Sequence, residues 1–355
     1  EYSAGTADLS GFGYNGLIGA TPEEVSRNVL LSDAAERTRP KLVILEDGSR
    51  MVFFIGNRGA EGNANDMTLY YSVYSGGVWS APQTVADDGT ADTSPCVLHK
   101  DGKVYVAWAD ANRKYTESDS IIDKLNGLGI SVAIYENGVM GEEYSLVNDQ
   151  FFNFAPQLNV VEDKLYCSYM KRDLTNVKKD EDLLDLTGVY STMAYAVLDT
   201  ATGNTEDEEF ISIEHSTLTD PLVLDYNSVA ANINGVDYIL ATYTVDEDCD
   251  LKTAEDRELF LSVTDVGISL TFAPIKLTND GHGQSTPQLT DIDGTVYLSW
   301  IENGSVFNII DVSDMLNSLF NPESPSAAMH LQSAVKGDSD WYRKTSEQLG
   351  MDSEI

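Results

Sequence analysis

The feature that most constrains this chain of 355 residues is an internal repeat. Clear copies occupy residues 95–108, 156–169 and 287–300. An earlier copy with one extra turn residue starts at Pro40, and a weaker copy without proline starts at Ser228. Self-similarity at long period indicates an array of equivalent structural units. Any chemistry specific to one place must then lie in what differs between the copies.

Each copy begins with two strand-like segments joined by a tight turn. Asp-Gly and Asn-Gly between apolar runs are strong signals for a β-hairpin, because the turn requires positive φ. The turn pairs are Asp101-Gly102, Glu162-Asp163, Asn234-Gly235 and Asp293-Gly294. The sequence therefore predicts an antiparallel hairpin at the start of each copy.

Aromatic residues in the second strand indicate what lies on either side of the hairpin. The positions of Tyr105 and Trp108 differ by three, an odd number, as do those of Tyr166 and Tyr169. Such residues point to opposite faces of a strand. Both faces are therefore expected to be buried, which is typical of a propeller blade with a neighbour on each side.

Two further strand-like segments follow each of the first four copies; after Trp108 they are residues 130–135 and 143–147. We therefore predict an all-β fold, a β-propeller of four-stranded antiparallel blades. Five blades are expected near residues 40–90, 95–150, 156–215, 226–280 and 285–315, with the N-terminal stretch 8–33 completing the last. A closing strand would remove the open sheet edge. The alternative is part of a six- to eight-bladed propeller.

The C-terminal stretch 317–355 fits none of the copies and is predicted to be an extension, a linker or a fragment boundary. Because the chain starts at Glu1 without methionine, we expect a processed or engineered segment of a larger protein.

Composition narrows the choice of partner. The chain has 58 acidic and 22 basic residues, a formal net charge of −36, which disfavours nucleic acid and anionic membrane surfaces. No apolar run approaches the roughly 18 residues that span a bilayer, so membrane insertion is not expected. Three cysteines cannot all pair. Acidity and modular β structure favour a secreted or surface-anchored protein of a Gram-positive bacterium, monomeric within a larger multidomain chain.

The first copy resembles the opening of a sialidase-type propeller over about 50 residues. It has arginines one and three positions before Pro40, whereas the family's Arg-Ile-Pro phrase has its carboxylate-binding arginine two before, where this chain has Thr38. Residues 72–79 have the spacing of the family's Asp-box, with Tyr74 in place of the aspartate. The resemblance implies a sialidase-like fold. Activity of that kind would need an arginine triad, a tyrosine nucleophile with a glutamate and an acid/base aspartate; Arg39, Arg58 and Arg172 are the triad candidates.

The loops between second and third strands are long, and inserts on one face of a repeat array usually mark its binding face. Polar residues open these loops; the alternative is a solvated acidic rim. The candidate ligand-binding residues on this face are Arg39, Asn57, Arg58, Asp110, Asn112, Arg172, Asp173, His282, Glu302 and Asn303.

One loop carries alternating carboxylates at Asp246, Asp248 and Asp250. Oxygen ligands of this kind suit Ca²⁺, but Leu251 stands where an EF-hand needs glycine and Arg257 where it needs glutamate. Calcium at a loop of another type is the cofactor hypothesis, and exposed charge without a metal is the alternative.

These patterns favour an extracellular recognition module that binds a glycan or a host or cell-surface protein on the long-loop face. A glycoside hydrolase of sialidase-like or five-bladed type is the second hypothesis, because such enzymes use carboxylates that sequence alone cannot select among 58. A spacer module of a large adhesin, without a ligand of its own, is the third.

Overall fold

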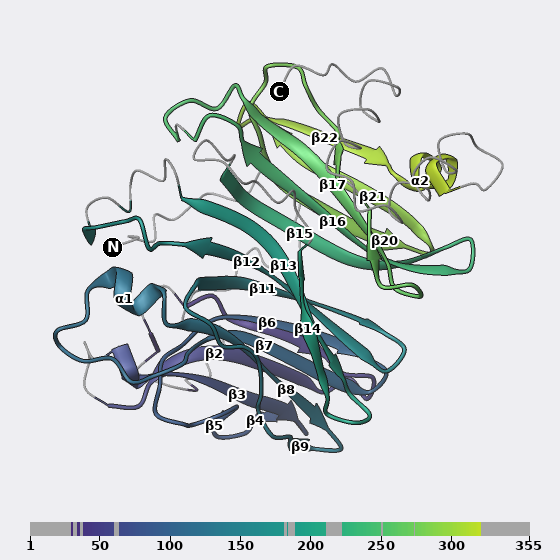
Figure 1. The fold of residues 1–355 in the computed structure, drawn as a ribbon. Helices are drawn as coiled ribbons and strands as arrows, with labels where there is room; N and C mark the ends of the chain where they lie inside the picture. Colours follow the sequence, from purple (N-terminus) through teal and green to yellow (C-terminus); the bar gives the residue numbers. More distant parts are fainter. Residues whose placement is uncertain are drawn as a thin grey trace, which may run out of the picture.

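A computed structural model describes residues 30, 34–35, 38–59, 64–180, 183, 189–210, 222–249, 251–272 and 274–320. Over these residues the chain forms five antiparallel sheets that follow one another along the sequence. In each sheet, the first three strands lie side by side in sequence order, and further outer strands pair with the third where they are described. We number the sheets blade 1 to blade 5, from the purple strands to the yellow-green strands of Figure 1.

Blades 1 and 2 have three strands and a fourth, outer strand split into two short pieces. Blade 1 comprises β1 (Lys41–Ile44), β2 (Arg50–Asn57), β3 (Met67–Ser75), β4 (Val78–Trp79) and β5 (Gln83–Thr84). Blade 2 comprises β6 (Asp92–Lys100), β7 (Lys103–Ala111), β8 (Leu128–Glu136), β9 (Val139–Met140) and β10 (Tyr144–Val147).

Blade 3 has four continuous strands, and blade 4 again has a split outer strand. Blade 3 comprises β11 (Phe152–Val161), β12 (Lys164–Asp173), β13 (Tyr190–Asp199) and β14 (Thr205–Phe210). Blade 4 comprises β15 (Leu222–Ile233), β16 (Val236–Asp246), β17 (Arg257–Asp265), β18 (Leu270–Thr271) and β19 (Ile275–Lys276).

Blade 5 has three strands within the described residues: β20 (Gln284–Ile292), β21 (Thr295–Glu302) and β22 (Val306–Asp311). The predicted all-β propeller fold of four-stranded antiparallel blades is confirmed. The closing strand expected within residues 8–33 lies outside the described residues, and closure at five blades stays a prediction. None of the described helices is long and apolar enough to cross a membrane. They are η1 (Ala64–Asp66), α1 (Ile121–Leu125) and α2 (Ser313–Phe320), none of which the sequence predicted.

The hairpin turns have the backbone that their sequences require. Both residues of three turn pairs have positive φ, for example 51° at Asp101 and 74° at Gly102. Asn234-Gly235 and Asp293-Gly294 behave in the same way. This backbone matches the twist of the two strands that it joins.

Hydrophobic side chains between consecutive blades make the core. Trp108 packs toward blade 1 and Tyr105 toward blade 3, while Tyr169 packs back toward blade 2 and Tyr166 forward toward blade 4. All four are at most 4% exposed. The prediction that these aromatics face opposite neighbours is therefore confirmed, and each blade pair is held mainly by apolar burial.

A β-bulge recurs near the start of three inner strands. Ser94, Ala155 and Thr286 precede the repeat proline with φ of 51°, 52° and 51°, and the strand register shifts at each of them. A left-handed conformation at a residue other than glycine costs on the order of 1–3 kcal/mol, so the surrounding packing must impose it. The bulges re-aim the adjoining side chains, as bulges near binding sites often do.

Candidate functional site

A cavity of about 680 Å³ lies among the inner strands of blades 1 to 4. Its wall includes the bulged segments around Ser94 and Ala155, together with Arg39 and Lys41 of blade 1 and Asn227 of blade 4. The pairing of Asp92 with Asp110 puts the start of an inner strand beside the end of the second strand. The cavity therefore lies toward the end of the blades that carries the long loops.

The charge of the cavity wall is opposite to that of the whole chain. None of its described lining residues is acidic, and two of them, Arg39 and Lys41, are basic. Within the described residues, neither cation makes an ion pair, and both side chains are exposed. The remaining wall combines apolar residues with hydroxyl and amide groups: Ala35, Thr38, Ile55, Met67, Thr93, Ser94, Pro95, Cys96, Ala155, Pro156, Gln157, Leu158 and Asn227.

Amide groups connect the inner strands on the side of the cavity formed by blades 3 and 4. Asn227 donates to Gln157 Oε1 at 3.1 Å, and Gln157 donates to the carbonyl of Tyr226 at 2.8 Å. Asn227 Oδ1 in turn accepts the backbone N–H of Leu289 in blade 5, at 2.7 Å. These bonds cross from blade to blade, so the two amides are held in place before any ligand arrives.

The three arginines proposed as a triad do not converge. Arg39 lines the cavity. Arg58 forms an ion pair with Asp87 and donates to the carbonyl of Thr90 at 2.9 Å, which ties the blade 1 loop to the crossover into blade 2. The structure thus gives no arginine triad among these residues, because the guanidinium of Arg58 is used in holding two blades together.

Arg172 lies between blades 3 and 4. Its guanidinium is 5.0 Å from the ring centroid of Phe154 and donates to the carbonyl of Val223 at 3.1 Å. Burial lowers the pKa of this guanidinium to about 10. Arg172 therefore supports the interface between two blades and is not among the described residues that line the cavity.

Asp110 also lies between blades, where it accepts hydrogen bonds from Ser131 Oγ at 2.9 Å and Thr90 Oγ1 at 3.2 Å. Burial raises its pKa to about 8. Its strand neighbour Asp92 is 5% exposed and accepts the backbone N–H of Leu69, and burial raises the pKa of Asp92 to about 7. Neither aspartate is among the described residues that line the cavity.

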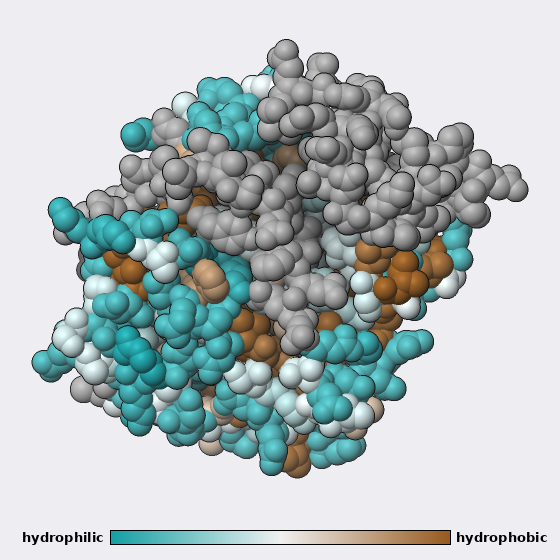
Figure 2. Space-filling model, viewed as in Figure 1, coloured by the Kyte–Doolittle hydropathy of each residue, from teal (hydrophilic) through white to brown (hydrophobic). Residues whose placement is uncertain are grey.

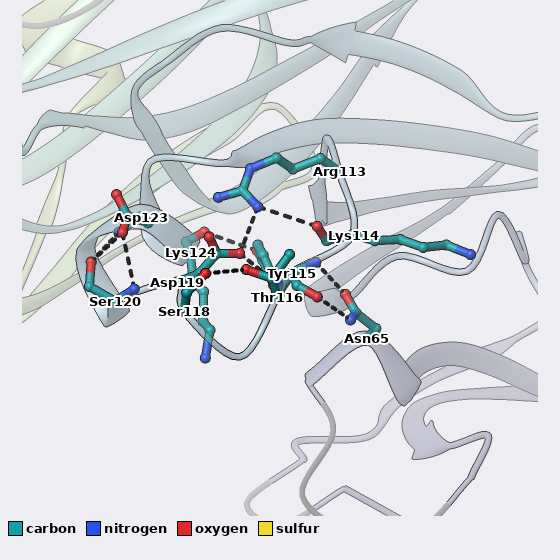
Figure 3. Close-up of polar contacts among 10 residues, drawn as sticks. All are labelled: Asn65, Arg113, Lys114, Tyr115, Thr116, Ser118, Asp119, Ser120, Asp123 and Lys124. Carbon is teal, nitrogen blue, oxygen red and sulfur yellow. Dashed lines mark hydrogen bonds and ion pairs between the residues drawn. The ribbon is translucent and has the colours of Figure 1, made fainter.

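The long loop of blade 2 is braced by its own side chains (Figure 3). Arg113 pairs with Asp119 at 2.7 Å, and Tyr115 exchanges two hydrogen bonds with the side chain of Asn65 in the blade 1 loop. Ser120 caps α1. Asn112, a candidate ligand residue, donates to the carbonyl of Asp149 at 3.2 Å. This part of the long-loop face is therefore preordered.

Two further candidate ligand-binding residues are not among the described residues that line the cavity. Asn57 is the last residue of β2, and no described side chain bonds to its amide. Asp173 ends β12 and accepts the backbone N–H of Thr175 at 2.9 Å, which stabilises a turn.

His282, Glu302 and Asn303 do come together, at the crossover from blade 4 into blade 5. His282 Nδ1 lies 3.2 Å from Glu302 Oε1 and 3.9 Å from Asp280 Oδ2. Asn303 Oδ1 accepts the N–H of Gly283 at 3.1 Å. The sequence placed three of these residues on one face but did not single out Asp280.

The predicted calcium loop is partly assembled. Asp246 and Asp248 lie together with Asp256, and their carboxylate oxygens fall within 4.8 Å of one another. Arg257 Nε donates to Asp246 Oδ2 at 3.0 Å and partly offsets the charge. Asp250, the third predicted ligand, lies outside the described residues. Calcium at this cluster stays a prediction.

Several wall residues were not predicted as site residues: Lys41, Ser94, Gln157 and Asn227 among them. The available signal was position within the repeat. Ser94 immediately precedes a repeat proline and Gln157 immediately follows one, at the start of an inner strand. Equivalent positions in a propeller meet around its axis, so the residues flanking each proline were the ones to compare.

Most of the described surface in the view of Figure 2 is hydrophilic, and apolar residues appear there in small separate groups. A large contiguous apolar patch would indicate a hydrophobic protein interface. On this face the described surface offers polar contacts instead.

No protein-family model matches this chain, and no curated protein matches it. Similar solved structures include a mutant of Trypanosoma rangeli sialidase, with 12% identity, a TM-score of 0.34 and coverage of 80% of this chain and 56% of that one. Another is an α-L-arabinofuranosidase of Fusarium graminearum, with 11% identity, a TM-score of 0.47 and coverage of 79% and 84%. The chain thus spans little more than half of the sialidase. The fold assignment rests on the blades described above.

Proposed function

We propose that this propeller is a recognition module that binds an acidic saccharide, one bearing carboxylate or sulfate groups, in the cavity at its axis. The observation that carries the proposal is the charge of the cavity wall. Two cations and no described carboxylate line it, although acidic residues outnumber basic ones 58 to 22 in the chain. An anionic group bound there would avoid the field of the acidic surface and meet an arginine, which suits carboxylate and sulfate geometry.

The size and polarity of the cavity favour a sugar over a small inorganic anion. A volume of about 680 Å³ is in the range of small-molecule pockets and exceeds what one anion needs. Hydroxyl groups of Thr93 and Ser94 and amides of Gln157 and Asn227 offer donors and acceptors to a hydroxyl-rich ligand.

Binding is favoured over hydrolysis for a chemical reason. Glycoside hydrolases of the usual kind place two carboxyl groups about 5–10 Å apart across the scissile bond. The described cavity wall has none, and Asp92 and Asp110, whose pKa values are raised by burial, lie between blades. A protein ligand with an acidic segment is the alternative occupant of the cavity. Either ligand is consistent with a secreted or surface location.

The test is calorimetric titration of the wild type with paired acidic and neutral oligosaccharides, with and without Ca²⁺. Arg39→Gln and Lys41→Gln should each weaken binding of the acidic member about tenfold, since a hydrogen bond to a charged group contributes about 1.5–3 kcal/mol. Arg50→Gln is the matched control, because Arg50 is an exposed arginine at the hairpin end of β2.

Neutral and acidic sugars binding equally, or an unchanged affinity of Arg39→Gln, would contradict the proposal. Released sugar in the same samples would favour the hydrolase hypothesis. Binding of an acidic peptide with no binding of acidic sugars would replace the saccharide by a protein ligand.

A further inference from the structure

The crossovers into blades 2, 3 and 5 repeat one arrangement of side chains. Four residues after an aspartate comes the first or second residue of the inner strand. That residue pairs with one at the end of the second strand. In all three copies, the aspartate Oδ1 accepts the backbone N–H two residues on. The three sets are Asp88, Thr90, Asp92 and Asp110; Asp149, Phe151, Asn153 and Lys171; and Asp280, His282, Gln284 and Glu302.

In blade 3 the arrangement encloses a cation supplied by the chain. The ammonium of Lys171 lies 2.7 Å from Asp149 Oδ2 and 4.6 Å from the ring centroid of Phe151. Lys171 is 5% exposed. The amide of Asn153 holds the other oxygen of Asp149, at 2.8 Å. The buried ammonium is thereby paired, as burial of charge requires.

In blade 2 Asp110 occupies the corresponding position, and burial favours the protonated, neutral forms of Asp92 and Asp110. Burial raises their pKa values to about 7 and about 8, respectively. The two blades thus show two ways of balancing the same acidic position.

In blade 5 no lysine or arginine among the described residues occupies the corresponding position. Glu302 replaces the lysine and His282 replaces the phenylalanine, so an imidazole and two carboxylates face one another. Gln284 is 1% exposed and donates to Asp280 Oδ1 at 3.1 Å. Its carbonyl oxygen Oε1 is buried without a hydrogen-bond partner among the described residues. An imidazole and two carboxylates whose ligand atoms face one another offer a cation three ligand atoms at one place.

We propose that blade 5 binds a divalent transition-metal ion, with Zn²⁺ as the probe, through Asp280, His282 Nδ1 and Glu302, where blade 3 holds the ammonium of Lys171. One imidazole with two carboxylates suits zinc, whereas calcium prefers oxygen ligands alone. The three ligand atoms already lie within 4.8 Å of one another. Atoms that share a zinc ion at about 2.0–2.2 Å stand roughly 3–4 Å apart, so small side-chain rotations suffice.

The surrounding backbone holds these ligands in place. Gly283 and Asn303 exchange two hydrogen bonds, and a Cβ at Gly283 would lie 2.5 Å from the carbonyl oxygen of Ala254. The segment around His282 is therefore pinned between two loops. The side chains of His282 and Asp280 are 52% and 44% exposed, which leaves an entry path for the ion. None of the three ligands is among the described lining residues of the saccharide cavity.

The experiment is a calorimetric titration of Zn²⁺ into the full chain after treatment with a chelator. The wild type should bind one Zn²⁺ ion at this site. Glu302→Lys should bind it at least about tenfold more weakly, because the lysine restores the blade 3 arrangement and removes a ligand. The thermal melting temperature of Glu302→Lys should equal or exceed that of the metal-free wild type, which shows that it folds. Asp248→Asn, at the Asp246 cluster, should keep the site.

Equal Zn²⁺ affinity in wild type and Glu302→Lys would overturn the proposal, as would loss of the site in Asp248→Asn alone. A second readout uses the four histidines of the chain in a histidine-selective NMR spectrum. Zn²⁺ should shift one imidazole, the one that disappears in His282→Gln. A shift confined to another histidine, or no shift at all, would also overturn the proposal.

Discussion

Single residues in equivalent positions of this propeller carry different charges. Asp92 is a buried and Asp110 a half-buried carboxyl group, whereas the corresponding pair in blade 3 is Asn153 and Lys171. The repeat predicted where such positions lie, but not their ionisation, because burial depends on how neighbouring blades pack. For the same reason the sequence identified Arg39 at the cavity but not Asn227, whose place there depends on the adjoining inner strand.

The stability of the protein should depend on pH through these two aspartates. Their folded pKa values, about 7 and about 8, lie above the ordinary value of 3.8, so the native state binds more protons than the unfolded state between about pH 4 and pH 8. The free energy of unfolding should therefore fall as pH rises through this window. Melting temperatures measured from pH 5 to pH 8 should decrease by roughly 2–4 °C for each kcal/mol lost.

Asp110→Asn should flatten this dependence, because the amide cannot ionise. Asp163→Asn, at an exposed hairpin turn, is the control and should leave the slope unchanged. Parallel curves for the wild type and Asp110→Asn would show that this carboxyl group is not protonated in the native state.

At the scale of strands, local rules predicted much of each blade. The odd spacing of Tyr105 and Trp108 predicted which neighbour each side chain meets, because alternation along a strand is local. The bulges were not predicted: Ser94 and Thr286 have positive φ without the glycine that usually signals it. The split outer strands were missed as well, since pairing at a sheet edge depends on the preceding strand.

Gly129 of β8 should be essential for the outer strand of blade 2. A Cβ there would lie 2.1 Å from the carbonyl oxygen of Val147 in β10, far inside van der Waals contact. Gly129→Ala should therefore displace β10 and lower the free energy of unfolding by more than Gly235→Ala does. At Gly235 (φ 81°) a Cβ meets no atom within 4 Å, so only the backbone cost of about 1–2 kcal/mol applies.

Urea denaturation of both variants gives the comparison. Amide exchange at β10 shows whether that strand has separated. Equal losses in the two variants, with β10 still protected, would mean that the strand pair adapts to the extra carbon.

At the scale of the molecule, the two ends of the blade series differ from the middle. Pairing in blade 1 begins before β1, because Ala34 forms a bridge with Gly56 and the N–H of Ala35 bonds to the carbonyl of Ile55. Blade 5 ends at β22, whose outer edge has no partner strand among the described residues. Phe307 and Ile309 on β22 are 63% and 58% exposed. An outer strand of blade 5 placed before Ala34 in the sequence would lead into blade 1, as the outer strand of each other blade leads into the next blade.

We therefore predict that the segment around residues 25–33 pairs with β22 and closes the ring at five blades. Hydrogen exchange should find the β22 amides that do not bond to β21 protected in the full chain, and unprotected in a chain that begins at Ala34. An uncovered apolar strand edge also promotes association, so the shortened chain should aggregate at lower concentration. Amides of β12, in the middle of blade 3, are the control and should exchange alike in both chains. Fast exchange of the outer β22 amides in the full chain would favour a ring completed by other blades.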